Sequence, residues 1–200
     1  MKRISELAGV SQGLAVSGRG AGARSGDWEL RLAESADLVD DRLELEGLRS
    51  ISIQRSARTE RHLLRPYDVL VTARSQAVKV ALVPPAVSRT AAGVTLLVLR
   101  PRRPESGISH WLWYVLTSRS GRSAVERQLR PGMSLPSLSV SALAAVEIPV
   151  PSDAELHQLA KLIEISELAY QAGVGAARLR RETLRDSLVQ YFGGNVPGTE

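Results

Sequence analysis

The fold is decided at residues 132–164, which read GMSLPSLSVSALAAVEIPVPSDAELHQLAKLIE. Before this stretch lie alternating and fully apolar runs typical of strands, and after it apolar residues recur at helical spacing. Within it, apolar and mostly β-branched side chains favour extended backbone, namely Leu138, Val140, Val146, Ile148 and Val150. Pro149 and Pro151 hold the chain out of a helix and withhold hydrogen-bond donors. We therefore expect a strand that ends at these prolines, followed by a helix that Ser152 or Asp153 caps.

Strand patterns occupy much of the chain before this stretch. Apolar and polar residues alternate at 28–37 and again around Ile51 and Ile53, as half-buried strands require. Continuous apolar runs predict buried strands at residues 69–71, 78–83 and 95–99. A turn is expected at residues 73–76, between the first two of these strands, and a polar, basic loop at residues 55–61.

A helical spacing of apolar side chains predicts a helix at residues 109–129. Trp111 and Trp113 fall on nearly opposite faces of this helix, so at most one of them is fully buried. The other tryptophan either fills the join to a neighbouring element or stacks on a base.

The C-terminal part of the chain predicts one long helical segment that needs a partner helix. The residues expected to face that partner are Leu156, Leu159, Ile163, Leu168, Leu179, Leu184 and Leu188. Gly173 and Gly175 interrupt the pattern and indicate a kink, two shorter helices or a close helix contact. The predicted organisation is an α+β chain: a β-rich domain over residues 1–151, a helical segment over 152–192 and a disordered tail over 193–200.

Composition limits the possible compartments and chemistries. The 200 residues are 44% hydrophobic, which is enough for a core, and they include no cysteine, which excludes disulfides and thiolate metal sites. Residues 1–16 contain no continuous apolar segment, so we expect a cytoplasmic protein without a membrane span. The net charge of +5 and the pI of about 10.1 favour a polyanionic partner. Because almost all basic residues are arginine, they either pair bidentately with phosphates and guanine edges or reflect a GC-rich genome.

Three short motifs resemble known chemical sites but lack the neighbouring residues that such sites require. The glycine-rich residues 18–23 match the letters of a dinucleotide fingerprint, but no amphipathic helix follows them. Asp40 and Asp41 lack a third ligand for a metal and are expected to be solvated carboxylates in a turn. Asp68 and Lys79 lack the second acidic residue of a nuclease site, so Asp68 is expected to cap a turn and Lys79 to be solvated. We therefore predict no catalytic residues, no metal and no cofactor held by this chain.

Seven residues at the junction form a recognisable run: Leu138, Ser139, Leu143, Val146, Ile148, Pro149 and Pro151. This run resembles the specificity subunits of type I restriction–modification systems, in which a target-recognition domain closes with such residues and leads into a long helix. The segment at residues 64–75 also resembles that family, with Tyr67 and Ser75 in place of two expected glycines. In the helix, Leu156 replaces the usual glutamine of the family.

The resemblance implies a non-catalytic subunit that recognises double-stranded DNA. The implied partner is a methyltransferase subunit, which takes its methyl group from S-adenosylmethionine, with a restriction subunit as a further candidate. Full-length family members carry two target-recognition domains and two long helices, whereas this chain has one of each. The simplest completion is a homodimer through antiparallel C-terminal helices that reads a twofold-symmetric split site.

Candidate DNA-contacting residues follow from side-chain chemistry and loop placement alone. They are Arg19 and Arg24 in the glycine-rich loop, Arg55 and Arg58, Arg74 and Gln76 in the turn, and Arg130 with Ser134 near the junction. The competing hypothesis is a repurposed target-recognition domain that acts as a scaffold in an antiphage or regulatory complex and does not read DNA.

Overall fold

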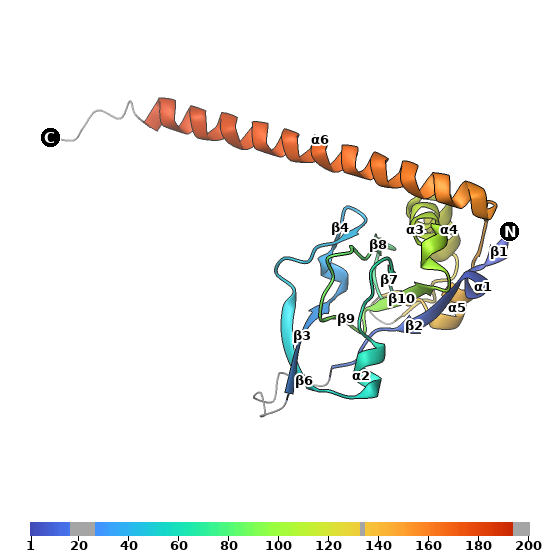
Figure 1. Cartoon of the computed structure of the whole chain (residues 1–200). Coiled ribbons are helices and arrows are strands. Elements are labelled where there is room, and N and C mark those ends of the chain that lie inside the picture. Colours follow the sequence, from blue (N-terminus) through green and yellow to red (C-terminus); the bar gives the residue numbers. More distant parts are fainter. Residues whose placement is uncertain (17–26, 133–134, 194–200) are drawn as a thin grey trace. The chain divides into compact units, whose positions relative to one another are not determined.

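The computed structural model describes residues 1–16, 27–132 and 135–193, which form two compact units. The first unit, Met1–Ala160, contains every sheet, the short helices and the beginning of the long helix (Figure 1). The second unit, Lys161–Glu200, contains the rest of that helix. The predicted α+β architecture is confirmed, while the predicted disordered tail lies almost entirely outside the described residues.

The main sheet of the first unit has six strands in the order β2-β10-β7-β8-β5-β4. Their bounds are β2 (Ala8–Gln12), β10 (Leu96–Pro101), β7 (Val69–Thr72), β8 (Val80–Leu82), β5 (Arg42–Leu43) and β4 (Leu38–Val39). All neighbours are antiparallel except β5 and β8, which run parallel. The buried strands predicted from the continuous apolar runs are β7, β8 and β10, and their side chains make much of the core.

A second sheet has three strands in the order β6-β3-β9, with bounds β6 (Arg49–Gln54), β3 (Asp27–Ala33) and β9 (Thr90–Ala92). The alternation predicted for β3 is confirmed, because Leu30 and Leu32 are buried while Glu29 is exposed. Two short strands form a separate antiparallel pair that joins the two ends of the domain. They are β1 (Lys2–Arg3) and β11 (Glu147–Ile148).

Six α-helices and two 3₁₀ turns are found among the described residues. They are α1 (Ile4–Leu7), η1 (Ser35–Asp37), α2 (Ala57–Arg61), η2 (Pro104–Ser106), α3 (Ile108–Thr117), α4 (Arg119–Glu126), α5 (Val140–Ala145) and α6 (Asp153–Gly193). The helix predicted at 109–129 is thus two helices, because Ser118 is extended and its hydroxyl caps α4 at the Gly121 amide. As predicted, only Trp113 is fully buried, while the Trp111 indole donates a hydrogen bond to the Pro149 carbonyl at 2.8 Å.

Two predictions of extended or irregular backbone are wrong, and a capping serine explains each. Val140, expected in a strand, begins α5, because the Ser139 hydroxyl accepts a hydrogen bond from the Ala142 amide at 3.1 Å. The predicted loop at 55–61 contains α2, which Ser56 caps in the same way. In both segments a local side-chain bond satisfies the first amides of a helix and outweighs strand propensity or polarity.

The long helix α6 begins where the sequence predicts and continues without a break through Gly173 and Gly175. Its first turn is closed by Ser152, whose amide and hydroxyl both donate to the Glu155 carboxylate at 2.8 and 2.6 Å. These hydrogen bonds lower the pKa of Glu155 below its usual value. Among the described residues, no helix combines the length and the apolar character that crossing a membrane requires.

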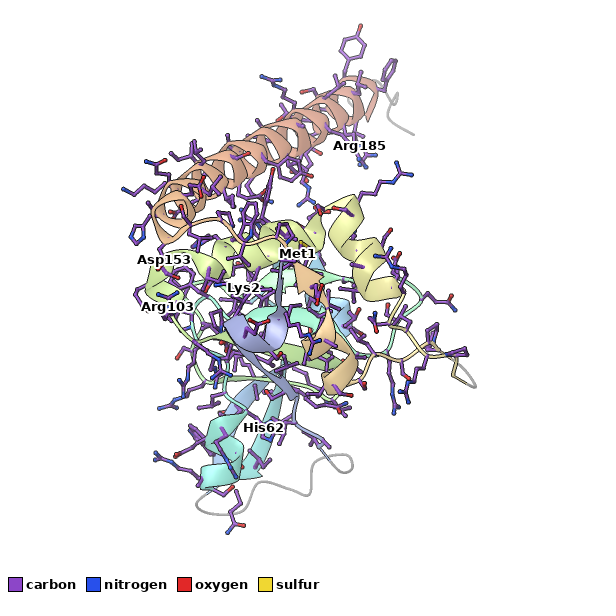
Figure 2. All side chains as sticks on the ribbon, turned by 90° about the vertical axis from the view of Figure 1, so that its right-hand side faces the viewer. Met1, Lys2, His62, Arg103, Asp153 and Arg185 are labelled. Carbon is purple, nitrogen blue, oxygen red and sulfur yellow. The ribbon has the colours of Figure 1, made fainter. Side chains whose placement is uncertain are left out.

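The beginning of α6 packs tightly against the turn that precedes α3. Gly107 lies there with a φ of +82°, and a Cβ atom at this position would lie 2.7 Å from the Leu156 carbonyl oxygen. Nearby, Arg103 pairs with Asp153 at 3.1 Å. Figure 2 labels these two residues, which lie close together. Leu156, which the sequence assigned to helix pairing, is only 2% exposed because it is buried within the first unit.

A buried ion pair joins β7 to β10. Asp68 is 1% exposed, and its carboxylate accepts from the Arg100 guanidinium at 3.0 and 2.7 Å and from the Arg65 amide at 2.9 Å. The last bond confirms that Asp68 caps a turn, whereas the pair with Arg100 was not predicted. The neighbouring Tyr67 has a φ of +67°, so the left-handed conformation expected of the family's glycine is present here in a tyrosine.

Replacement of Asp68 by alanine should lower the free energy of unfolding by about 3–5 kcal/mol, because it leaves the Arg100 guanidinium without its buried partner. Urea denaturation measures this loss. The matched control is Glu147→Ala, which removes an exposed ion pair with Arg3 and should cost less than about 1 kcal/mol. Similar, small losses for both variants would contradict a structural role for the Asp68 pair.

Candidate nucleic-acid interface

Two of the predicted DNA-contacting arginines come together across one short ribbon of backbone. Ser137 pairs with Arg74 on one side and with Arg130 on the other, in antiparallel register. The amides and carbonyls of Arg130 and Ser137 exchange two hydrogen bonds of 2.9 Å, and the Leu138 amide donates to the Ala73 carbonyl at 2.8 Å. We call Arg74, Ser137 and Arg130 the arginine row.

The side chains of the arginine row lie on one face, because residues directly opposite each other in antiparallel strands point the same way. Arg74 and Arg130 are exposed, and neither is in an ion pair with another of the described residues. Other arginines are neutralised, in the pairs Arg3–Glu147, Arg49–Glu34, Arg55–Glu60, Arg100–Asp68, Arg103–Asp153 and Arg122–Asp41. The arginine row is therefore a place where positive charge faces solvent and is not neutralised by a carboxylate of the described residues.

The turn after Arg74 presents Gln76 beside the arginine row. The Ser75 hydroxyl accepts a hydrogen bond from the Ala77 amide at 3.3 Å, which holds the turn in shape. Gln76 is exposed at this turn, as the sequence predicts. Its amide group carries both donors and an acceptor, which is the combination that recognises a base edge.

The remaining candidates do not join this group. Arg55 follows β6, pairs with Glu60 at 2.7 Å and lies 5.2 Å from the centre of the Trp28 ring. Its guanidinium is thus already engaged by a carboxylate and an aromatic face. Arg58 belongs to α2, but its side chain is not among those described. The other three candidates, Arg19, Arg24 and Ser134, lie outside the described residues.

Sequence reasoning missed Ser137, the central residue of the arginine row. It precedes the Leu138 of the junction run, but nothing in the local pattern marks it as functional. Its position depends on pairing with Arg74, which lies far away in the sequence. Only long-range register identifies it.

The two aspartates considered for a metal form the turn of the β4–β5 hairpin. Asp40 and Asp41 both have left-handed backbone, with φ of 47° and 59°. Asp41 is not simply solvated: its carboxylate accepts from Arg122 at 2.5 and 2.7 Å, and its carbonyl accepts from the Trp113 indole at 2.8 Å. Desolvation raises the pKa of Asp41 in spite of the Arg122 charge. The hairpin tip is therefore held by side chains of α3 and α4.

A hollow of about 360 Å³ lies beside this hairpin. It is lined by Leu38, Val39, Asp40, Asp41, Lys79, Val80 and Arg122. Lys79 is exposed, as predicted, and its ammonium group also donates to the carbonyls of Leu38 and Ser35 at 3.0 and 3.3 Å. In the part of the chain that the structure describes, no three His, Asp or Glu side chains gather closely enough to hold a metal ion. We interpret the hollow's charged groups as supports of the hairpin.

The second unit exposes many apolar side chains along α6. The last four residues predicted for helix pairing are 49–64% exposed: Leu168, Leu179, Leu184 and Leu188. Sequence reasoning did not select six further exposed side chains, namely Leu162, Ile165, Tyr170, Val189, Tyr191 and Phe192. The predicted Ile163, in contrast, is buried, and Leu159 is partly buried. An apolar helix surface of this extent is typical of a protein–protein contact.

Charge is unevenly distributed along the same helix. Residues 153–175 carry four carboxylates and one lysine: Asp153, Glu155, Glu164, Glu167 and Lys161. Residues 176–193 carry four arginines and two carboxylates: Arg178, Arg180, Arg181, Arg185, Glu182 and Asp186. The helix is thus acidic in its first half and basic in its second half.

Comparisons with known proteins bear on the fold. No protein-family model matches the chain, and no curated protein matches it. A chain from a structure that describes complex assembly and conformational transition of the type I R-M system is 19% identical, with a TM-score of 0.58 over 94% of this chain and 43% of that one. The type I restriction–modification system S subunit from M. genitalium is 14% identical, with a TM-score of 0.61 over 98% of this chain and 46% of that one.

At these identities the likeness concerns the fold. The chain has the fold of type I restriction–modification specificity subunits, as the junction residues led us to expect. It spans less than half the length of the solved chains that it matches.

Proposed function

We propose that the chain recognises double-stranded DNA sequence-specifically as the half-size specificity subunit of a type I-like restriction–modification system. The observation that carries the proposal is the arginine row on a domain of this fold, in which Arg74 and Arg130 are exposed and form no ion pair with a carboxylate of the described residues. Guanidinium groups in such a position suit phosphates and guanine edges. The subunit is non-catalytic and directs a methyltransferase partner, which supplies S-adenosylmethionine chemistry, and a restriction subunit is a further candidate partner.

A second copy of the same chain is the proposed partner of α6. The exposed apolar residues of the second unit call for a helix to cover them. Because α6 is acidic in its first half and basic in its second, two copies attract each other when they run antiparallel and repel when they run parallel. An antiparallel pair carries two recognition domains, which matches a chain that spans less than half of the solved chains it resembles.

Selection from a random duplex pool tests the proposed DNA recognition. The purified chain should enrich a split motif with inverted halves and bind it about 10³-fold or more tightly than a scrambled duplex. A single unrepeated half-site would support a DNA reader but contradict the symmetric dimer. Failure to enrich any sequence, even with a candidate methyltransferase present, would overturn the proposal and support the scaffold alternative.

Charge reversal in α6 tests the antiparallel pair. A variant with Arg180→Glu, Arg181→Glu and Arg185→Glu makes both halves acidic, and Glu164→Lys with Glu167→Lys makes the first half basic. Sedimentation should show that each variant alone dimerises at least tenfold more weakly than the wild type, and that an equimolar mixture regains a dimer. Unchanged dimerisation of either variant by itself would contradict the charge-complementary pairing.

A further inference from the structure

Backbone pairing sets the approximate spacing of the arginine row. Arg130 and Ser137 exchange both hydrogen bonds, whereas Arg74 and Ser137 form the other type of antiparallel pair, in which the opposed residues exchange none. The Cα atoms of such pairs are roughly 5.5 and 4.5 Å apart, so those of Arg74 and Arg130 lie roughly 10 Å from each other. This span of the backbone is well beyond the ~3.4 Å rise between nucleotides of one DNA strand, so the row is long enough to face more than one nucleotide.

The two guanidiniums of the row suit acceptors only. Each guanidinium offers donors and no acceptor, and the serine hydroxyl between them adds one more donor. Phosphate oxygens are acceptors only, whereas each base pair presents a pattern that mixes donors with acceptors or a methyl group. One guanine edge would occupy only one of the two guanidiniums, whereas successive phosphates offer acceptors to both guanidiniums and to the serine hydroxyl.

Gln76 has the complementary chemistry and lies two residues beyond Arg74. It is exposed on the turn that Ser75 stabilises, so its amide is presented by ordered backbone. A glutamine amide donates and accepts at once and pairs bidentately with the N6 and N7 atoms of adenine.

We propose that the arginine row anchors the phosphate backbone while Gln76 reads an adenine in the adjacent major groove. This division of roles rests on the proposed DNA-binding function and assigns each residue its part. Ser137 acts with the arginines as a third phosphate contact. Sequence preference at one position of each half-site comes from Gln76 and not from Arg74 or Arg130.

Affinity measured against salt concentration, on the enriched duplex and on a scrambled one, separates the two roles. Arg74→Ala and Arg130→Ala should each weaken binding to both duplexes by the same factor and reduce the salt slope by about 1. Gln76→Ala should keep the slope, weaken binding to the enriched duplex alone by roughly 10- to 100-fold and erase one adenine when the selection is repeated.

Two controls separate these effects from loss of charge and loss of fold. Arg103→Ala removes one positive charge from an exposed ion pair elsewhere and should leave the salt slope unchanged. Arg74→Lys keeps a charge for a phosphate but loses the planar fork that a guanine requires, so it should restore most of the slope and leave the motif intact. Thermal unfolding of each variant verifies that the domain is folded.

Several results would overturn the division of roles. An altered motif with an unchanged salt slope in Arg74→Ala or Arg130→Ala would make the arginines base readers. An unchanged motif in Gln76→Ala would remove its reading role. If the wild type enriches a motif and all variants behave like Arg103→Ala, only the proposed roles of these residues are wrong. If the wild type enriches no motif, the proposed DNA recognition is wrong as well.

Discussion

The buried pair of Asp68 and Arg100 is the interaction on which the candidate interface depends. It joins the beginning of β7 to the end of β10, and Arg100 also donates to the Leu63 carbonyl at 2.7 Å, so three segments meet at one guanidinium. A buried carboxylate is tolerated only when its oxygens are satisfied, and here they accept from a guanidinium and a backbone amide. The register of β7 against β10 then fixes where β7 ends and where the turn with Arg74 begins.

From that turn, the interface is built by backbone pairing. The segment before α5 returns to lie beside the turn, and Ser137 pairs with Arg74 and Arg130 together. The same segment leads through α5 and β11 into α6, whose first turns pack on Gly107. The chain thus connects the candidate DNA-contacting residues to the beginning of the long helix through one short and well-bonded stretch.

Local patterns in the sequence predicted the parts of the fold that local forces determine. The apolar runs predicted β7, β8 and β10, and the serine before α6 predicted its beginning. They failed where a side-chain cap decides between strand and helix, as at Ser139 and Ser56. They also gave no sign of the parallel pairs β3–β9 and β5–β8, because each joins residues that are far apart in the chain.

The candidate site was also predictable only in its local features. Arginines and a glutamine in turns are recognisable by chemistry, and three of those chosen lie near one another: Arg74, Gln76 and Arg130. Which arginines are neutralised is not visible in the sequence, because Arg55–Glu60 and Arg122–Asp41 depend on α2 and on the hairpin turn. Ser137 could be identified only from its backbone pairing with Arg74 and Arg130 in the structure.

The most direct test of the account is a hydroxyl-radical footprint of the purified chain on its enriched duplex. If two copies each place one recognition domain on DNA, both strands should show two protected blocks related by twofold symmetry, with an accessible spacer between them. One protected block, or uniform protection along the duplex at saturating protein, would contradict a symmetric pair of sequence-reading domains.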